Sequence, residues 1–139
     1  MSLNEKFLPP DDLPDFHRPF FEALKAHELR VQKCDDCGTL RYVPKEICAH
    51  CGGLGAAWTP LSGRGRVYTY TVIHRGPTPA YQADAPYVIA HVEMEEGPRV
   101  ISNLIGCAPA DVRIGMPVEV VYEDIVGDWT LFKFTPAKA

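Results

Sequence analysis

Long apolar runs and a secretory leader are both missing from this 139-residue sequence. No stretch approaches the roughly 18 consecutive apolar residues that a membrane-spanning helix needs. The start of the chain, MSLNEK, lacks the apolar core of a signal peptide. We therefore expect a soluble, cytoplasmic protein that does not contact a membrane and that keeps its cysteines reduced.

Positive charge is also scarce. The sequence has 14 lysines and arginines against 18 acidic residues, which gives a formal net charge of −4. The imbalance is the same on both sides of Pro60, with seven basic and nine acidic residues in each part. Proteins that bind nucleic acids take much of their affinity from cations that neutralise phosphates, so neither part of the chain is suited to a polyanion.

The short motifs of common enzyme classes are absent. A Gly-x-Gly pair at residues 63–65 fails as a phosphate-binding motif because Tyr68 stands where a third glycine is expected. Neither a Gly-x-Ser-x-Gly elbow nor an HExxH helix occurs. His74, His91 and Cys107 remain, but histidines on predicted strands and a lone cysteine without an assigned base are more often structural. We expect a protein that is not itself an enzyme.

The sequence does contain two matching cysteine pairs, CDDCG at residues 34–38 and CAHCG at residues 48–52. A C-x-x-C turn can place both sulfurs on one metal ion, and the glycine after it permits the positive φ that such a turn tends to need. His50 could replace a sulfur, but four thiolates are already present. The predicted ligands of a closed, structural zinc site, with iron as the alternative metal, are Cys34, Cys37, Cys48 and Cys51.

Other roles for these cysteines fit less well. Disulfides are disfavoured by the missing leader and by the odd total of five cysteines. A thioredoxin-like redox site would need a single pair near a βαβ pattern. Residues 29–32 are expected to lead into the first cysteine pair and residues 40–43 to return toward the second. The region has so few apolar residues that we expect it to need the metal in order to fold.

An amphipathic helix is predicted over residues 12–29. Asp15 is the expected N-cap, and Pro19 falls near the first turn, where its missing N–H does no harm. Phe20 and Leu24 share one face at i, i+4 spacing. So short a helix must bury that face, either on its own domain or on a partner subunit. The predicted partner-docking residues are Phe20, Phe21 and Leu24.

The rest of the chain is predicted to be all-β. We divide the sequence into a helical segment at 1–29, a zinc ribbon at 30–60 and a barrel at 61–139. Five strands are expected, at residues 66–74, 87–94, 99–105, 117–123 and 129–135. A longer link at 108–116 is expected to contain a helical turn. Mainly β structure with an N-terminal helix, a rubredoxin-like zinc ribbon and a five-stranded OB-fold barrel is the predicted fold, although another small barrel or sandwich would also fit the strand pattern.

Alternation along the strands predicts which side chains face the core. Val88, Ala90, Val92 and Met94 share the expected core face of the second barrel strand. Tyr68 and Tyr70 share one face of the first. The sequence EEGP at residues 95–98 predicts a compact turn, so the second and third strands should form a hairpin.

The loop between the first two barrel strands is the main candidate for binding. Residues 74–86 carry three prolines and a glycine, which exclude a regular strand, and the loop is longer than an ordinary hairpin connection. OB barrels bind ligands with the loop in this position. Either the loop pads the barrel mouth or it contacts a ligand or protein. The predicted ligand-binding residues are His74, Arg75, Tyr81 and Arg99.

Several motifs together resemble those of one protein family. They are FFEAL at 20–24, the two cysteine pairs, SGRGRVY at 62–68, PYVIA at 86–90, GPRV at 97–100 and IGMPVEV at 114–120. The chain resembles, from about Asp15 to Phe134, a family of zinc-ribbon plus OB-fold proteins long labelled as a domain of unknown function or as nucleic-acid-binding by analogy of fold. The resemblance implies an accessory protein that associates with thiolase-like or hydratase enzymes acting on acyl-CoA and helps to assemble them or to hand over the thioester.

The residue types help to decide between nucleic-acid binding and an acyl-CoA role. A single-strand binder combines a positive groove with aromatic stacking platforms, and only the aromatics are evident here. Four arginines, at positions 64, 66, 75 and 99, could still cluster in space, but so few cations would also suit the 3′-phosphate and pyrophosphate of CoA. We therefore expect a non-catalytic partner of a thiolase-like or hydratase enzyme that helps to bind acyl-CoA, with single-stranded nucleic-acid binding as the alternative.

Overall fold

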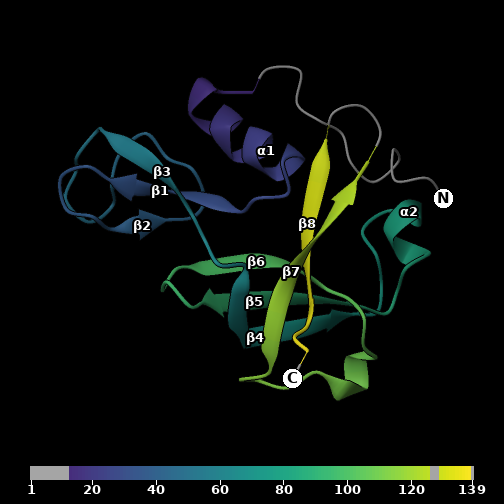
Figure 1. The fold of residues 1–139 in the computed structure, drawn as a ribbon. Coiled ribbons are helices and arrows are strands. Elements are labelled where there is room, and N and C mark those ends of the chain that lie inside the picture. Colours follow the sequence, from purple (N-terminus) through teal and green to yellow (C-terminus); the bar gives the residue numbers. More distant parts are fainter. Residues whose placement is uncertain (1–12, 126–128, 139) are drawn as a thin grey trace.

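The computed structural model describes residues 13–125 and 129–138 (Figure 1). The helices are α1 (Arg18–Lys25) and α2 (Pro79–Gln82), with 3-10 turns η2 (Asp15–His17) and η3 (Pro109–Asp111). A small sheet contains β1 (Arg30–Cys34), β2 (Leu40–Arg41) and β3 (Ala56–Pro60). A closed barrel contains β4 (Arg64–Ile73), β5 (Tyr87–Met94), β6 (Arg99–Leu104), β7 (Pro117–Asp124) and β8 (Thr130–Pro136). The predicted mainly β fold is confirmed, including the helical turn in the link before β7.

Helix α1 is shorter than expected. Asp12, where the helix was predicted to begin, lies outside the described residues. Asp15 belongs to the preceding turn η2, and its Oδ1 accepts a 3.2 Å hydrogen bond from Arg18 Nε instead of capping α1. The helix ends after eight residues, and His27 then takes a φ of +57°, a left-handed conformation that terminates helices. No helix in the described ranges is long and apolar enough to span a membrane.

The apolar face of α1 belongs to the chain's own core. Phe20 and Leu24 are only 6% and 2% exposed. They cluster with Leu29 and Val31 at the base of the ribbon and with barrel residues such as Phe134. The docking role predicted for Phe20 and Leu24 is therefore corrected, because their side chains are already covered within the chain. Phe21 is only partly buried and remains a predicted docking residue.

The ribbon sheet has the order β2–β1–β3 and is antiparallel throughout. Strands β1 and β2 fall within the two segments expected to lead to and from the first cysteine pair, whereas β3 was not expected, because its five residues, AAWTP, lack a strand-like alternation. Pairing makes this segment a strand: it follows β1 along its full length, from Arg30↔Pro60 to Cys34↔Ala56. Directly after β3, Leu61 N donates a backbone hydrogen bond to Leu29 O, and the chain then enters the barrel.

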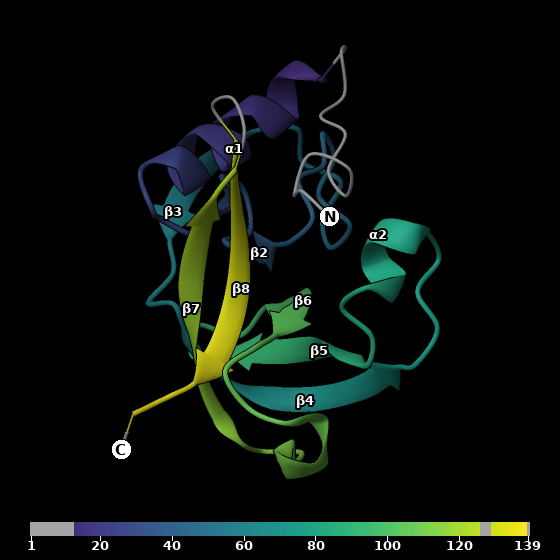
Figure 2. The ribbon, with the colours of Figure 1, turned by 90° about the vertical axis from the view of Figure 1, so that its right-hand side faces the viewer.

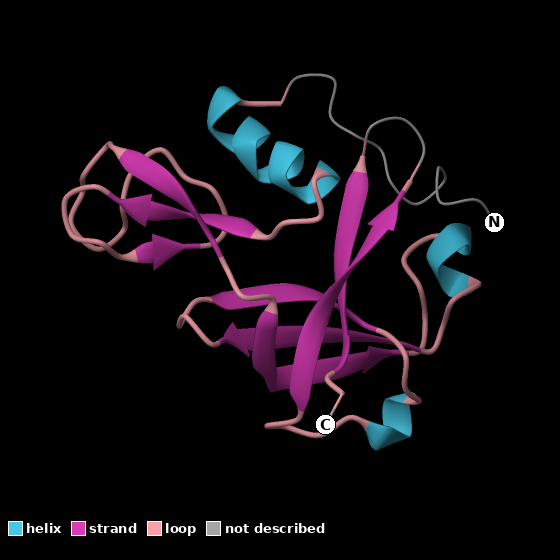
Figure 3. Cartoon of the chain, in the orientation of Figure 1, coloured by secondary structure: helices cyan, strands magenta, loops and turns pink. Residues whose placement is uncertain are grey.

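The barrel closes in the order β4–β5–β6–β8–β7, with β7 paired back to β4. The predicted hairpin joins β5 and β6. Figure 2 shows β4, β5 and β6 as one curved layer from which β7 and β8 rise toward α1, and Figure 3 shows the helices outside the barrel wall. Among the described residues β6 meets β8 at one parallel pair, Leu104↔Phe134, so the two strands diverge on either side of it.

The core confirms one predicted face and corrects another. All four residues of the predicted core face of β5 are buried: Val88, Ala90, Val92 and Met94. In β4 the register shifts between Val67 and Thr69, which marks a β-bulge. Tyr68 is exposed and Tyr70 packs against the core, so these two tyrosines do not share a face as the alternation suggested.

Replacement of Phe134 with alanine tests the dependence of the barrel on this core. Phe134 is fully buried where β6 and β8 meet, so loss of its ring should lower the free energy of unfolding by about 3 to 5 kcal/mol. The control Ile114→Ala, at a side chain that is 71% exposed, should change it by less than about 0.5 kcal/mol. Urea denaturation of the metal-loaded protein measures both, and equal small effects would contradict this core.

Candidate functional site

The four predicted cysteine ligands lie together at the tip of the ribbon. Their sulfurs are all within 4.8 Å of one another. Cys34 Sγ is 3.5 Å from Cys51 Sγ, and Cys37 Sγ is 3.7 Å from Cys48 Sγ, far beyond the roughly 2 Å of a disulfide bond. Four sulfurs bound about 2.3 Å from one zinc ion would lie about 3.8 Å apart. The cluster therefore has the size of a tetrahedral metal site.

The two cysteine turns have matching backbone hydrogen bonds. Gly38 N donates to Cys34 O at 2.9 Å, and Gly52 N donates to Cys48 O at 2.8 Å. Both glycines have a φ between +75° and +78°, as the sequence predicted. Asp36 packs so close to Gly53 that a Cβ there would lie 2.4 Å from Asp36 Oδ2. The turns are thus fixed by their own backbone, and each aims two sulfurs at the same point.

Hydrogen bonds favour ionisation of some of the four thiols, but all four can be thiolates together only if a cation lies among them. The Thr39 hydroxyl, 3.1 Å from Cys37 Sγ, lowers the pKa of that thiol. Backbone N–H groups of Cys51 and His50 lower the pKa of Cys48 to about 6. The Gly53 N–H lowers the pKa of Cys51, yet the neighbouring sulfurs outweigh it and raise that pKa to about 12. Thiolates are the metal-binding form, and four of them need a bound cation to coexist.

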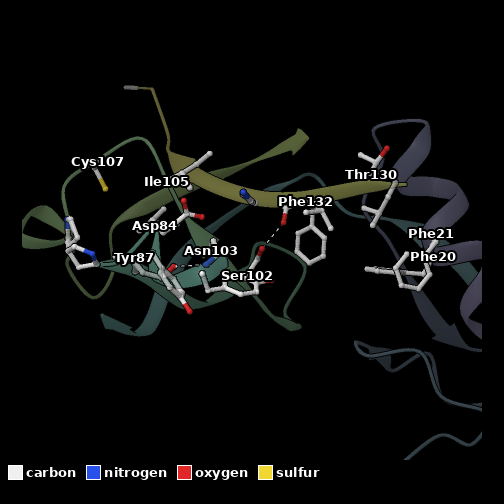
Figure 4. Close-up of a pocket in the computed structure, with 18 residues that line it drawn as sticks. Phe20, Phe21, Asp84, Tyr87, Ser102, Asn103, Ile105, Cys107, Thr130 and Phe132 are labelled. Atoms are coloured by element: carbon white, nitrogen blue, oxygen red, sulfur yellow. Dashed lines mark hydrogen bonds between the residues drawn. The ribbon is translucent and has the colours of Figure 1, made fainter. Parts of the chain in front are cut away.

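A second feature is an apolar cavity of about 460 Å³, bounded by α1, the segment around α2 and the split between β6 and β8 (Figure 4). Aromatic rings form its walls. Phe20 and Phe132 are 6.1 Å apart between ring centres on one side, and Tyr81 and Tyr87 are 6.0 Å apart on the other. Ile105 and Cys107 lie at one end in Figure 4, and Phe20 and Phe21 at the other.

Several polar groups of the cavity wall already have partners. Ser102 Oγ donates to Phe132 O at 2.6 Å, and Asn103 Nδ2 donates to Val88 O at 3.2 Å. Lys133 Nζ pairs with Glu123 at 2.6 Å. Because these groups are engaged within the protein, the wall suits an apolar guest better than a strongly polar one.

The structure separates the four predicted ligand-binding residues. Tyr81, on α2, lines the cavity, whereas His74 and Arg75 are exposed on the preceding loop and do not line it. Arg99 lies at the opposite end of the barrel sheet. Strand β5 pairs with the last residue of β4 at Tyr87 and with Arg99 at Glu93, positions about 20 Å apart along the strand. These four residues do not form one site.

Helix α2, which brings Tyr81 to the cavity, was not predicted from the sequence. Thr78 caps this helix, its hydroxyl accepting a 3.4 Å hydrogen bond from Tyr81 N, and Pro79 occupies the first turn. The Thr-Pro dipeptide was a usable signal for a helix start. Gly76 has no room for a side chain, since a Cβ would lie 2.4 Å from Gln82 N. The loop is thus folded back on itself.

The cavity does not present an activated nucleophile. Burial raises the pKa of the Cys107 thiol, and Asp111 raises it further. Within the described ranges, none of the hydroxyl or thiol groups that line the cavity is hydrogen-bonded to a histidine. A thiol with a raised pKa and no base beside it is a poor nucleophile.

The fold and the cysteine site define a metal-ribbon protein with an OB-fold barrel, and comparison with known proteins gives its family. A model described as the rubredoxin-like zinc ribbon domain of ChsH2 matches residues 21–55, and one described as its C-terminal OB-fold domain matches residues 58–123. A DUF35 domain-containing scaffold protein of Methanocaldococcus jannaschii is 43% identical over 97 residues, which cover 69% of this chain and 68% of that protein. The chain belongs to this DUF35 family of ChsH2-type zinc-ribbon and OB-fold proteins, which confirms the predicted resemblance.

Other relatives carry enzyme names. A probable enoyl-CoA hydratase alpha subunit of Thermomonospora curvata is 42% identical over 118 residues, which cover 85% of this chain but 36% of that protein. The benzoylsuccinyl-CoA thiolase subunit BbsA of Geobacter metallireducens is 32% identical over 98 residues, 68% of this chain and 64% of that protein. In the solved structure of the Ltp2-ChsH2(DUF35) aldolase, a chain with 39% identity matches with a TM-score of 0.81 and covers 92% of this chain and 98% of its own length.

Replacement of one cysteine tests the metal site. We expect elemental analysis to find about one zinc ion per chain, and Cys48→Ser to lose it, because three thiolates no longer close the tetrahedron. The ribbon should then become sensitive to proteolysis while much of the barrel resists. The control Cys107→Ser, outside the cluster, should keep the metal. A metal-free wild-type protein that is fully folded would contradict the assignment.

Proposed function

We propose that this chain is a non-catalytic accessory subunit that holds a structural zinc ion, associates with a hydratase- or thiolase-type enzyme and helps to bind or hand over acyl-CoA. Its family membership supports the accessory role, since relatives are named as scaffold proteins or as subunits of CoA-dependent enzymes. The apolar cavity, with its aromatic walls and engaged polar groups, is the observation that carries the acyl-CoA part.

Zinc is the metal we assign to the cysteine cluster, and we assign it a structural role. Four thiolates fill a tetrahedral zinc ion and leave no position open for a substrate. Cys34 and Cys48 are buried, so the site also anchors the ribbon against its own interior. Thiolates that hold a metal must stay reduced, which fits a cytoplasmic protein.

The cavity suits the acyl end of a thioester. An acyl chain gains free energy when apolar surface leaves water, at about 25 cal/mol per Å². The aromatic side chains supply such surface from α1, β8, α2 and β5, and so connect the helix with the loop at residues 74–86. Phe21, partly buried at the rim of α1, is the residue we keep as a contact for the partner enzyme.

Single-stranded nucleic-acid binding is less well supported. The four arginines that might have formed a positive groove are engaged or apart: Arg64 pairs with Glu95 at 3.3 Å, and Arg66 Nη1 donates to Gly115 O at 3.0 Å. Arg99 and Arg75 lie at opposite ends of the sheet, too far apart to belong to one groove. A track of phosphates would require a continuous row of cations on one face.

Affinity purification of the zinc-loaded protein from its native cell tests the accessory role. We expect a hydratase- or thiolase-type subunit to co-purify in fixed stoichiometry, and the isolated chain to turn over no acyl-CoA thioester. Turnover by the isolated chain that Cys107→Ser abolishes would contradict the proposal. So would tight, salt-sensitive binding of single-stranded oligonucleotides in place of acyl-CoA.

A matched pair of isoleucines tests the cavity. Ile105 lines the cavity and is 42% exposed, whereas Ile101 on β6 is 41% exposed and does not line it. Ile105→Trp should fill the space and weaken the binding of butyryl-CoA by about tenfold or more, while Ile101→Trp should leave it unchanged. Isothermal titration calorimetry measures both affinities. Equal affinities in the two variants would remove the cavity from the proposal.

A further inference from the structure

A basic pocket lies where the ribbon meets the β5–β6 hairpin. It is open, has a volume of about 650 Å³ and is lined by residues 39–42, Lys45, residues 48–50 and residues 97–99. Its four basic side chains, which define what we call the basic pocket, are Arg41, Lys45, His50 and Arg99. None of the described residues that line it is acidic. Such a concentration of positive charge stands out in a chain with a net charge of −4.

One buried side chain positions the Arg41 guanidinium and the backbone at Lys45. Gln32 is only 5% exposed, and its Oε1 accepts hydrogen bonds from Arg41 Nε at 2.9 Å and from Lys45 N at 2.7 Å. Arg41 Nη1 is buried and has no hydrogen-bond partner within the described part of the chain. A buried guanidinium nitrogen without a partner is costly, and a nearby anion would offset that cost.

Arg99 is held differently. Its guanidinium carbon lies 3.7 Å from the centre of the Tyr68 ring, so it stacks on the ring. Glu93 stands opposite Arg99 in the β5–β6 pairing, yet no ion pair joins them in the described residues. The described ion pairs also leave Arg41 and Lys45 without a carboxylate. Three positive side chains therefore line the pocket without a carboxylate partner in the described part of the chain, and the thiolate of Cys48 is the negative group that lines it with them.

The basic pocket and the apolar cavity are neighbours. Tyr42 lines the pocket, and the centre of its ring is 6.0 Å from that of Phe20 and 6.4 Å from that of Phe132, both of which line the cavity. Strand β6 links the two sites, because it begins at Arg99 and ends at Leu104. The two ends of β6 are about 17 Å apart.

We propose that the basic pocket binds the phosphate groups of the acyl-CoA whose acyl end occupies the cavity. This inference rests on the proposed function and deepens it. The pantetheine arm has about as many chain atoms as four to five extended residues and so reaches roughly 16 Å. That reach matches the length of β6. The arm thus lies along β6, with the anionic end at Lys45 and Arg99 and the thioester near Leu104, where the strand reaches the cavity.

Two ligands and three double variants of the full, zinc-loaded chain test this arrangement. Butyryl-CoA carries the phosphates, and S-butyryl-pantetheine has the same acyl group and arm without them. Lys45→Ala with Arg99→Ala should weaken butyryl-CoA about tenfold, with the loss shrinking at high salt, and should leave S-butyryl-pantetheine unchanged. The charge-matched control, Arg113→Ala with Lys138→Ala, changes two exposed cations outside both sites and should alter neither affinity by more than about twofold.

A conservative double variant, Lys45→Arg with Arg99→Lys, should keep the wild-type affinity for butyryl-CoA, and zinc content should be equal in all variants. The inference is overturned if the alanine variant binds butyryl-CoA as tightly as the wild type. If that variant also no longer co-purifies with the enzyme subunit, the pocket contacts an acidic protein surface instead, and the accessory role stands. A wild-type chain that binds neither ligand would overturn this inference together with the acyl-CoA part of the proposed function.

Discussion

The convergence of four cysteine sulfurs on one point is the constraint on which the ribbon depends. The small sheet has few buried apolar residues of its own beyond Leu29 and Val31, and these belong to the barrel's cluster. Its outer turns are positioned by the cysteines instead. The second of these turns, including the metal ligand Cys48, also lines the basic pocket, so the metal site helps to fix the wall of that pocket. A structural metal can thus serve binding without touching a ligand.

The cavity exists because strands β6 and β8, which close the barrel, are paired over only a short length. A single parallel pair, Leu104↔Phe134, joins these strands in the described residues, and their divergence leaves a space that side chains do not fill. Helix α1 covers one end of this space with Phe20 and Phe21, and α2 brings Tyr81 to the other side. The helix is therefore part of the cavity wall as well as of the core. This double role explains why Phe20 cannot also serve as a docking residue.

Periodicity and spacing predicted most of the fold. The cysteine spacing identified the ribbon, and the alternation of Val88, Ala90, Val92 and Met94 identified the buried face of β5. The failures have physical reasons. Strand β3 has no alternation and is ordered by its pairing with β1, and the bulge at Tyr68 depends on the register with β5. The candidate site was harder to predict from the sequence, because the cavity and the basic pocket bring together residues that are far apart in the chain. Examples are Phe21 with Tyr81 and Lys45 with Arg99. Only the Thr-Pro start of α2 was a local signal that could have been used.

The central claim is that the acyl group of an acyl-CoA enters the cavity between α1, α2 and the β6–β8 split. Photo-crosslinking tests it most directly, with an acyl-CoA that carries a diazirine at the end of a short acyl chain and peptide mapping of the labelled, zinc-loaded protein. The account predicts labels on residues of the cavity wall, such as Tyr81, Ile105 and Leu131. Labels confined to the ribbon or to the exposed Ile114, or a protein that free acyl-CoA does not protect from labelling, would contradict it.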